Sequence, residues 1–241
     1  MMLFASDLDN TLIHSYKAAK TGAICVEVYG GKELSYMTPE AFTLLKEVAG
    51  KCIFVPITTR SLEQYRRIDL GVKPPYAIVA HGALLLIEGK VDEQWSLETR
   101  RIINMPLPKL RECALLYDIR FVDEFFLFAK SADPQQAVHM LQGTMEANKF
   151  EVCSVHNKVY VFPSGLNKGM ALERLKKRLQ IKTVICAGDS QLDIAMLALA
   201  DLAIAPESLD LSHSNMRIST SDDFALYVLE TVKHFSKGLK P

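Results

Sequence analysis

Short apolar runs that end in polar residues recur along this chain, and they constrain its fold more than any other feature. Residues 2–6, 52–57 and 183–187 are largely apolar runs of strand length, each followed by acidic residues or threonines within a few positions. A run that is apolar on both faces is typical of a parallel strand covered by helices on each side. Helical patterns separate these runs, so the sequence predicts an α/β fold with a parallel sheet.

The elements of this parallel part are expected at both ends of the chain. We expect strands at 2–6, 52–57, 76–80, 183–187 and 202–205, and helices at 38–50, 61–69, 168–179, 191–200 and 221–236. The helix at 38–50 has the clearest boundaries. Thr38-Pro39-Glu40 reads as a cap, a proline in the first turn and an acid near the helix start, and Gly50 ends the pattern.

The middle of the chain follows a different pattern. Three predicted hairpins pair residues 84–87 with 91–95, 119–122 with 125–129, and 150–155 with 158–162. Helices are expected at 108–117 and from 133 to about 148. Strand pairs interleaved with helices are typical of an antiparallel sheet with helices on one face. We therefore predict a core domain built from residues 1–82 and 164–241, and an inserted α+β domain at 83–163.

Composition excludes several classes of partner. The chain has 28 basic and 28 acidic residues, so its formal net charge is zero and it has no overall attraction to nucleic acid or anionic lipid. It contains no apolar run of about 18 residues and no pattern of a signal peptide. We expect a cytoplasmic protein with no nucleic-acid or membrane partner, and the oligomeric state stays open. Widely spaced cysteines are expected to be reduced and mostly buried: Cys25, Cys52, Cys113, Cys153 and Cys186.

Polar side chains at the ends of the predicted parallel strands form the candidate site. In open parallel sheets, ligands bind at this edge, so residues far apart in sequence are expected to meet there. Clustered carboxylates repel one another unless a cation such as Mg²⁺ neutralises them. A single Asp or Thr at such a position is most often a turn or cap residue, so the hypothesis depends on the whole set. Its members are Asp7, Asp9, Thr58, Thr59, Lys168, Asp189 and Asp193.

These residue types suit phosphoryl chemistry. A carboxylate such as Asp7 can attack phosphorus and form an aspartyl-phosphate. The Thr58 hydroxyl can donate to phosphate oxygens, and the Lys168 ammonium can offset their charge. Lys168 stands at a predicted helix start, where the helix dipole disfavours a cation, and this favours a functional role for it.

Four segments resemble the motifs of the haloacid dehalogenase-like hydrolases, in the same order. Residues 7–12 (DLDNTL) resemble the first motif, 57–60 the second, 167–172 the third and 188–193 the fourth. The insert between the second and third motifs resembles the branch with a C2-type cap, which includes sucrose-phosphatase-like and Cof-like phosphatases. The resemblance implies a Rossmann-like core with an inserted α+β cap domain. Residues 79–83 are similar to the Asn-Gly-Ala segment of that branch, with His81 in place of the Asn.

The resemblance also implies roles for the candidate residues. Asp7 would be the nucleophile and a Mg²⁺ ligand, and Asp9 the general acid and base that also binds Mg²⁺ through its backbone carbonyl. Thr58, Thr59 and Lys168 would bind the phosphoryl group, and Asp189 with Asp193 would complete the metal site. The chain departs from the branch at Leu192, where Asn is usual, and at Thr59, where Gly is usual.

The expected activity is Mg²⁺-dependent hydrolysis of a small phosphorylated metabolite, a sugar phosphate by the resemblance. This makes the chain a phosphoric monoester hydrolase. Two alternatives stay open: a phosphomutase or phosphotransferase that passes the phosphoryl group to a sugar hydroxyl, and a catalytically silent metabolite-binding module, which only Leu192 favours. Polar residues at the edges of the predicted cleft are more commonly ordinary surface or turn residues: Arg60, His81, His156 and Lys158.

Overall fold

A five-stranded parallel sheet forms the centre of the molecule in the computed structural model, which describes residues 2–19, 21–103, 114–146, 148–209 and 215–238. The strand order is β15-β14-β13-β1-β5, and all neighbours are parallel. The predicted parallel sheet is therefore confirmed for the strands at 2–6, 52–57, 183–187 and 202–205, whereas the strand expected at 76–80 belongs to a separate antiparallel sheet, and β15 was missed by the sequence analysis. The strands of the parallel sheet are β1 (Met2–Ser6), β5 (Ile53–Pro56), β13 (Thr183–Ala187), β14 (Leu202–Pro206) and β15 (Met216–Ser219).

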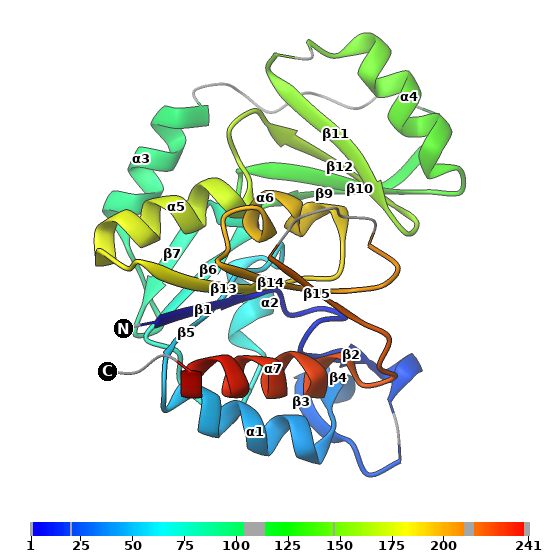
Figure 1. The fold of residues 1–241 in the computed structure, drawn as a ribbon. Coiled ribbons are helices and arrows are strands. Elements are labelled where there is room, and N and C mark those ends of the chain that lie inside the picture. Colours follow the sequence, from blue (N-terminus) through cyan, green and yellow to red (C-terminus); the bar gives the residue numbers. More distant parts are fainter. Residues whose placement is uncertain (1, 20, 104–113, 147, 210–214, 239–241) are drawn as a thin grey trace.

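Helices cover both faces of this sheet (Figure 1). Helices α1 (Pro39–Ala49) and α7 (Phe224–Gly238) lie on one face, and α5 (Lys168–Leu179) and α6 (Ile194–Leu197) on the other. Successive residues of a strand point to opposite faces, so Phe4 packs with the α1 and α7 side while Leu3 and Ala5 pack with the α5 and α6 side. All of β1 is buried, as its continuous apolar run predicts.

Cap residues set where the helices begin. The Thr38 side chain accepts a hydrogen bond from the Ala41 N–H at the start of α1, and Gly50 follows its last residue, as predicted. Helix α2 (Leu62–Arg66) begins after Ser61 but is shorter than predicted. The segment predicted as a helix at 191–200 is a 3₁₀ turn (Gln191–Asp193) followed by the short α6.

An antiparallel sheet lies above the parallel one in Figure 1, with α4 (Pro134–Thr144) on one of its faces. Its order is β11-β12-β10-β9, and two of the three predicted hairpins are confirmed as β9–β10 and β11–β12. The turn residues Asp123, Glu124 and His156 have the positive φ angles that tight hairpin turns require. The strands are β9 (Leu116–Val122), β10 (Phe126–Ser131), β11 (Phe150–Val155) and β12 (Lys158–Pro163).

The predicted hairpin at 84–95 is only half right. Strand β7 (Leu84–Ile87) pairs with β6 (Tyr76–Val79) and with the short β8 (Lys90–Val91). Residues 93–95 instead begin α3 (Glu93–Ile103), because the Asp92 side chain accepts a hydrogen bond from the Trp95 N–H and caps the helix.

Two further expectations concern the inserted region: the helix at 108–117 and the boundaries of the inserted domain. Of the helix expected at 108–117, residues 108–113 lie outside the described residues, and 116–117 belong to β9. The division of the chain into two domains at residues 83 and 163 stays a prediction. Trp95 of α3 joins the inserted region to the rest of the chain: its ring packs with the α5 side of the parallel sheet, and its indole N–H donates to the Gly82 carbonyl.

A third sheet was missed by the sequence analysis. It is antiparallel with the order β2-β4-β3, formed by β2 (His14–Ser15), β4 (Lys32–Met37) and β3 (Ile24–Tyr29). Its tight turn uses Gly30 and Gly31, both with positive φ angles. The sheet follows the first motif directly, and it brings Glu27 and Ser35 beside the second motif.

Two expectations drawn from the sequence concern membrane-spanning helices and the burial of the cysteines. No helix among them is long and apolar enough to cross a membrane. Cys186 is buried and free, whereas Cys25, Cys52 and Cys153 are free but only partly buried, so the expectation of mostly buried thiols was too strong. Cys113 lies outside the described residues.

Two glycine substitutions test the packing of the helices. A Cβ on Gly169 in α5 would lie 2.4 Å from the Ala195 carbonyl oxygen, whereas a Cβ on Gly143 in α4 would meet nothing within 4 Å. We expect Gly169→Ala to lower the free energy of unfolding by about 1–3 kcal/mol, and Gly143→Ala to raise it by up to about 1 kcal/mol. Urea denaturation measures both, and equal stability of the two variants would contradict this packing.

Candidate active site

A buried ion cluster joins three distant segments of the chain. Asp7 directly follows β1, and its N–H donates to the Ala187 carbonyl of the neighbouring strand β13. Lys168 is the first residue of α5, and its side chain is only 2% exposed. Its Nζ lies 2.5 Å from Asp7 Oδ1 and 2.6 Å from Asp193 Oδ1. One ammonium group therefore holds two carboxylates that are 186 positions apart.

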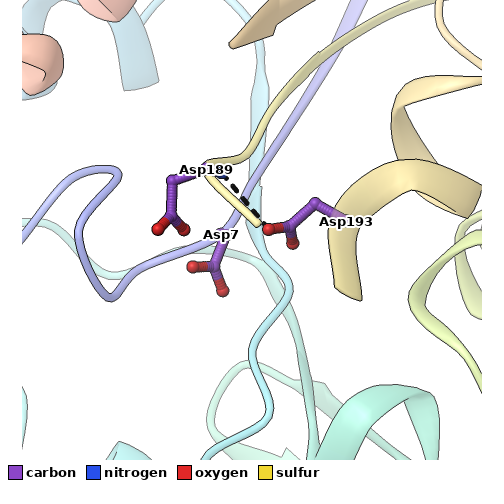
Figure 2. A group of neighbouring side chains, drawn as sticks. All are labelled: Asp7, Asp189 and Asp193. Carbon is purple, nitrogen blue, oxygen red and sulfur yellow. Dashed lines mark hydrogen bonds between the residues drawn. The ribbon is translucent and has the colours of Figure 1, made fainter. Parts of the chain in front are cut away.

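Asp193 also organises the loop after β13. Its Oδ2 accepts hydrogen bonds from the Ser190 N–H at 3.0 Å, from the Ser190 hydroxyl at 2.9 Å and from the Asp189 N–H at 3.2 Å. The loop curls around this carboxylate and brings Asp189 toward Asp7 (Figure 2). Gly188 is required here because a Cβ would lie 2.4 Å from the Asp193 Cβ.

The three carboxylates carry more negative charge than the site compensates. One oxygen each of Asp7, Asp189 and Asp193 lies within 4.8 Å of the others, while Lys168 supplies one positive charge. Burial and the neighbouring Asp193 raise the pKa of Asp189 to about 6. The donor set consists of closely spaced hard oxygens, which is the chemistry that binds Mg²⁺. A divalent cation would balance the two uncompensated charges.

The remaining pKa shifts follow from the same crowding. Burial raises the pKa of Asp7 well above its ordinary value, and the Asp193 and Asp189 carboxylates add to this effect while Lys168 opposes it. Burial alone would lower the pKa of Lys168, but Asp193 and Asp7 outweigh it and raise the pKa. Lys168 is therefore held as an ammonium at every physiological pH.

Asp9 faces a different partner. Arg60 binds its carboxylate in a bidentate manner, with Nε 2.7 Å from Oδ2 and Nη2 2.8 Å from Oδ1. The other side of the guanidinium contacts Glu27, whose Oε2 lies 2.8 Å from Arg60 Nη1 and accepts a hydrogen bond from the Ser35 hydroxyl. Glu27 is only 3% exposed. The third sheet thus fixes the orientation of Arg60, and Arg60 fixes that of Asp9.

These groups line one cavity of about 470 Å³. Asp7, Asp9, Lys168 and Asp189 line it from the carboxyl edge of the parallel sheet. The antiparallel sheet contributes the opposite wall with three side chains of β10 and β12, namely Phe128, Lys158 and Tyr160. The cavity therefore lies between the two sheets.

The structure brings together most of the residues predicted for the site. Asp7, Lys168, Asp189 and Asp193 contact one another or lie within a few ångströms. Asp9 and Thr59 line the same cavity. The side chain of Thr58 is fully buried, and its Oγ1 accepts a hydrogen bond from the Arg60 N–H. The observed contact of Thr58 thus shapes the turn that carries Arg60, and its contact with a phosphoryl group stays a prediction.

Two of the three departures from the family pattern, His81 and Leu192, have structural explanations. His81 adopts a φ of 59°, a left-handed conformation in which Asn and His are both enriched. Its ring stacks on Phe162 with 4.0 Å between centroids, and burial, then Lys168, lowers its pKa. Leu192 packs against the apolar cluster that includes residues of β11 and β12. A leucine at this position therefore contributes apolar contact between the turn after β13 and the antiparallel sheet.

Glu27 and Ser35 were not found by the sequence analysis. The available signal was one acidic residue inside the otherwise apolar run 24–28. A buried carboxylate almost always has a charged or hydrogen-bonding partner, so such a residue indicates an ion pair without saying with which residue.

The Glu27–Arg60 contact can be tested through stability. Glu27→Gln keeps the size of the side chain but leaves Arg60 and Arg67, the second arginine beside Glu27, without their shared negative charge. We expect the free energy of unfolding to fall by about 2–4 kcal/mol. The control is Glu146→Gln, which removes an exposed pair with Lys149 and should change stability little. Equal effects of the two substitutions in urea denaturation would contradict the buried role of Glu27.

Comparisons with known proteins agree with this fold. A family model described as haloacid dehalogenase-like hydrolase matches residues 115–208. The phosphoglycolate phosphatase 2 of Saccharolobus solfataricus is 24% identical over 175 residues, which cover 70% of each chain. The phosphoglycolate phosphatase of Sulfurisphaera tokodaii is 22% identical over 171 residues, covering 69% of this chain and 70% of the relative.

Solved structures share the whole fold. The sucrose-phosphatase of Synechocystis superposes with a TM-score of 0.68 at 19% identity, covering 97% of both chains. A haloacid dehalogenase-like hydrolase of B. subtilis has a TM-score of 0.64 at 17% identity, covering 97% of this chain and 99% of that one. With four motifs in order around the Asp7–Lys168 cluster and a family model that matches residues 115–208, the chain is similar to the haloacid dehalogenase-like hydrolases.

Proposed function

We propose that this chain is a Mg²⁺-dependent phosphatase that hydrolyses a small phosphorylated metabolite through an aspartyl-phosphate on Asp7. The match to the family model and the two relatives named as phosphatases support the broader statement, a phosphoric monoester hydrolase. The observation that carries the proposal is the buried contact of Lys168 with Asp7 and Asp193 at the cavity. Such a costly arrangement of buried charges is typical of an active site.

The metal would be held by the oxygen donors of the cluster. Asp7, Asp189 and the Asp9 backbone carbonyl would be its ligands, with Asp193 close by. The excess of carboxylates over cations among these residues supports this assignment. Bound Mg²⁺ would supply positive charge that offsets the carboxylates and the phosphoryl oxygens.

Asp7 is suited to attack because its two oxygens differ. Lys168 holds Oδ1, which leaves Oδ2 as the atom that forms the bond to phosphorus. As that bond forms, the bond from phosphorus to the leaving oxygen breaks, and Asp9 gives this oxygen a proton. Asp9 then takes a proton from a water molecule, whose oxygen attacks phosphorus and releases Asp7. Lys168 stabilises the charge that develops on the phosphoryl oxygens.

Arg60 supports the assignment of Asp9. Two parallel hydrogen bonds fix the plane of the Asp9 carboxylate while its side chain stays 47% exposed. A base that takes a proton from water needs this combination of fixed orientation and access, and the guanidinium favours the carboxylate form that such a base requires.

The substrate is proposed only as a small phosphorylated metabolite, because two lines of support favour different compounds. The sequence resemblance favours a sugar phosphate, whereas the curated relatives are named for phosphoglycolate. A cavity of about 470 Å³ suits a small metabolite of either class. The proposal also includes a cytoplasmic location and no nucleic-acid or membrane partner. The neutral net charge supports the statement about partners.

Removing the nucleophile tests the proposed reaction. Wild-type protein with Mg²⁺ should release inorganic phosphate from p-nitrophenyl phosphate, and EDTA should stop it. Asp7→Asn should lower kcat by at least about 10³-fold because the amide cannot form the intermediate. The control Asp69→Asn changes an exposed carboxylate in a turn and should keep full activity. Near-normal phosphate release by Asp7→Asn would contradict the mechanism, and substrate turnover without free phosphate would indicate a phosphotransferase.

Metal binding should depend on pH in a defined direction. Because burial raises the pKa of Asp189 to about 6, the metal-free protein is stabilised by protonation and loses stability as the pH rises through about 6. A cation competes with that proton, so Mg²⁺ should stabilise the protein more at pH 7.5 than at pH 5. At a hundredfold excess over Kd, the expected rise in Tm at pH 7.5 is about 5–10 °C.

The control for this measurement is Asp189→Asn. It should weaken the pH dependence of the metal-free protein in this range, to which Asp7 also contributes, and remove the rise in Tm with Mg²⁺. Equal stabilisation of wild type and variant by Mg²⁺ would place the ion elsewhere.

A further inference from the structure

Lys158 differs from the other charged side chains that line the cavity. Among the residues that the structure describes, every other cation of the lining lies within 4.0 Å of a carboxylate, and Lys158 does not. The pairs are Lys168 with Asp7 and Asp193, Arg60 with Asp9 and Glu27, and Arg67 with Glu27. Among the described residues, no carboxylate therefore pairs directly with the positive charge of Lys158.

The surroundings of Lys158 increase this imbalance. Lys158 is the first residue of β12 and lies opposite Lys130 of β10, so the two side chains share one face of the antiparallel sheet. Arg120 lies on that face too, opposite Phe128. Arg120 and Lys130 both bind Asp118, so one carboxylate serves two cations. The face that the sheet turns to the cavity is thus electropositive around Lys158.

This arrangement has an energetic cost. The pKa of Lys158 is lowered by burial first and then by the nearby cations of Arg60, Lys130 and Arg120, while Asp9 opposes the shift. Its ammonium lies 5.3 Å from the centre of the Phe128 ring, which compensates only in part. A half-buried cation without a carboxylate partner is the state that an incoming anion would stabilise.

The position of Lys158 indicates which part of a substrate it would meet. Lys158 and Asp9 line the same cavity, Asp9 from the edge of the parallel sheet and Lys158 from the antiparallel sheet. The Asp9 carboxylate acts on the Lys158 ammonium across this cavity. In the proposed mechanism Asp9 protonates the leaving oxygen, so the group attached to that oxygen extends toward Lys158.

We propose that Lys158 binds a carboxylate on the leaving part of the substrate, so that the substrate is a phosphorylated hydroxy acid. The inference rests on the proposed function and narrows its substrate class. A phosphorylated sugar without a second charge would leave the Lys158 ammonium without an anionic partner. A carboxylate would neutralise it and would also orient the ester for attack by Asp7.

Three phosphate esters of nearly equal size test this proposal. They are 2-phosphoglycolate, ethylene glycol monophosphate and O-phosphoethanolamine, which place an anionic, a neutral and a cationic group at the same distance from phosphorus. For the wild-type protein we expect kcat/KM to fall in that order, by about tenfold or more from the anionic to the neutral ester. Phosphate release from p-nitrophenyl phosphate with Mg²⁺ measures the basic activity separately.

Variants of Lys158 test whether this residue is responsible. Lys158→Met should lower kcat/KM for 2-phosphoglycolate about tenfold, mainly through KM, and leave the neutral ester within about twofold. Lys158→Glu should favour O-phosphoethanolamine over 2-phosphoglycolate, and Lys158→Arg should retain much of the wild-type order. Lys130→Met is the matched control, because Lys130 shares the sheet face but is bound to Asp118 and does not line the cavity.

The outcomes separate the inference from the proposed function. The inference would be overturned if the wild type showed no preference in kcat/KM for the anionic ester. It would also be overturned if Lys158→Met lowered kcat/KM equally for all three esters, since Lys158 would then act on the phosphoryl group. A wild-type protein that hydrolyses none of these esters but still cleaves p-nitrophenyl phosphate would also overturn it. Failure to cleave p-nitrophenyl phosphate with Mg²⁺ would instead contradict the proposed function itself.

Discussion

The contact of Lys168 with Asp7 and Asp193 is the interaction on which the site depends. It links the end of β1, the start of α5 and the turn before α6 through a single buried ammonium. Placing a cation at a helix start and burying it are both unfavourable, and two carboxylates compensate. The parallel pairing of β1 with β13 and the close approach of Gly169 to Ala195 hold these three segments in register.

Three of the four sheets among the described residues contribute separate parts of the cavity. The parallel sheet supplies the carboxylates at its edge, and the small sheet β2-β4-β3 orients Asp9 through Glu27 and Arg60. The antiparallel sheet contributes an aromatic and cationic wall, which includes Lys158. The first two parts suit chemistry common to phosphate esters, so the third is the part that can distinguish one leaving group from another.

The sequence predicted what depends on local pattern. Continuous apolar runs identified β1, β5 and β13, and their polar ends identified Asp7 and Asp189 because parallel strands share a carboxyl edge. Residues 92–95 were misassigned because one side-chain cap, Asp92 on the Trp95 N–H, decides between strand and helix there. The contact of Glu27 with Arg60 could not be predicted, since nothing in either segment specifies a partner 33 positions away.

A crystal structure of the protein with Mg²⁺ and beryllium fluoride, a mimic of a phosphoryl group attached to an aspartate, tests the central claim most directly. The account predicts beryllium bonded to Asp7 Oδ2, its fluorines within hydrogen-bond distance of Lys168 Nζ, and Mg²⁺ bound to Asp7 and Asp189. Beryllium on Asp9 or on any other carboxylate, or an ion bound away from Asp189, would contradict it.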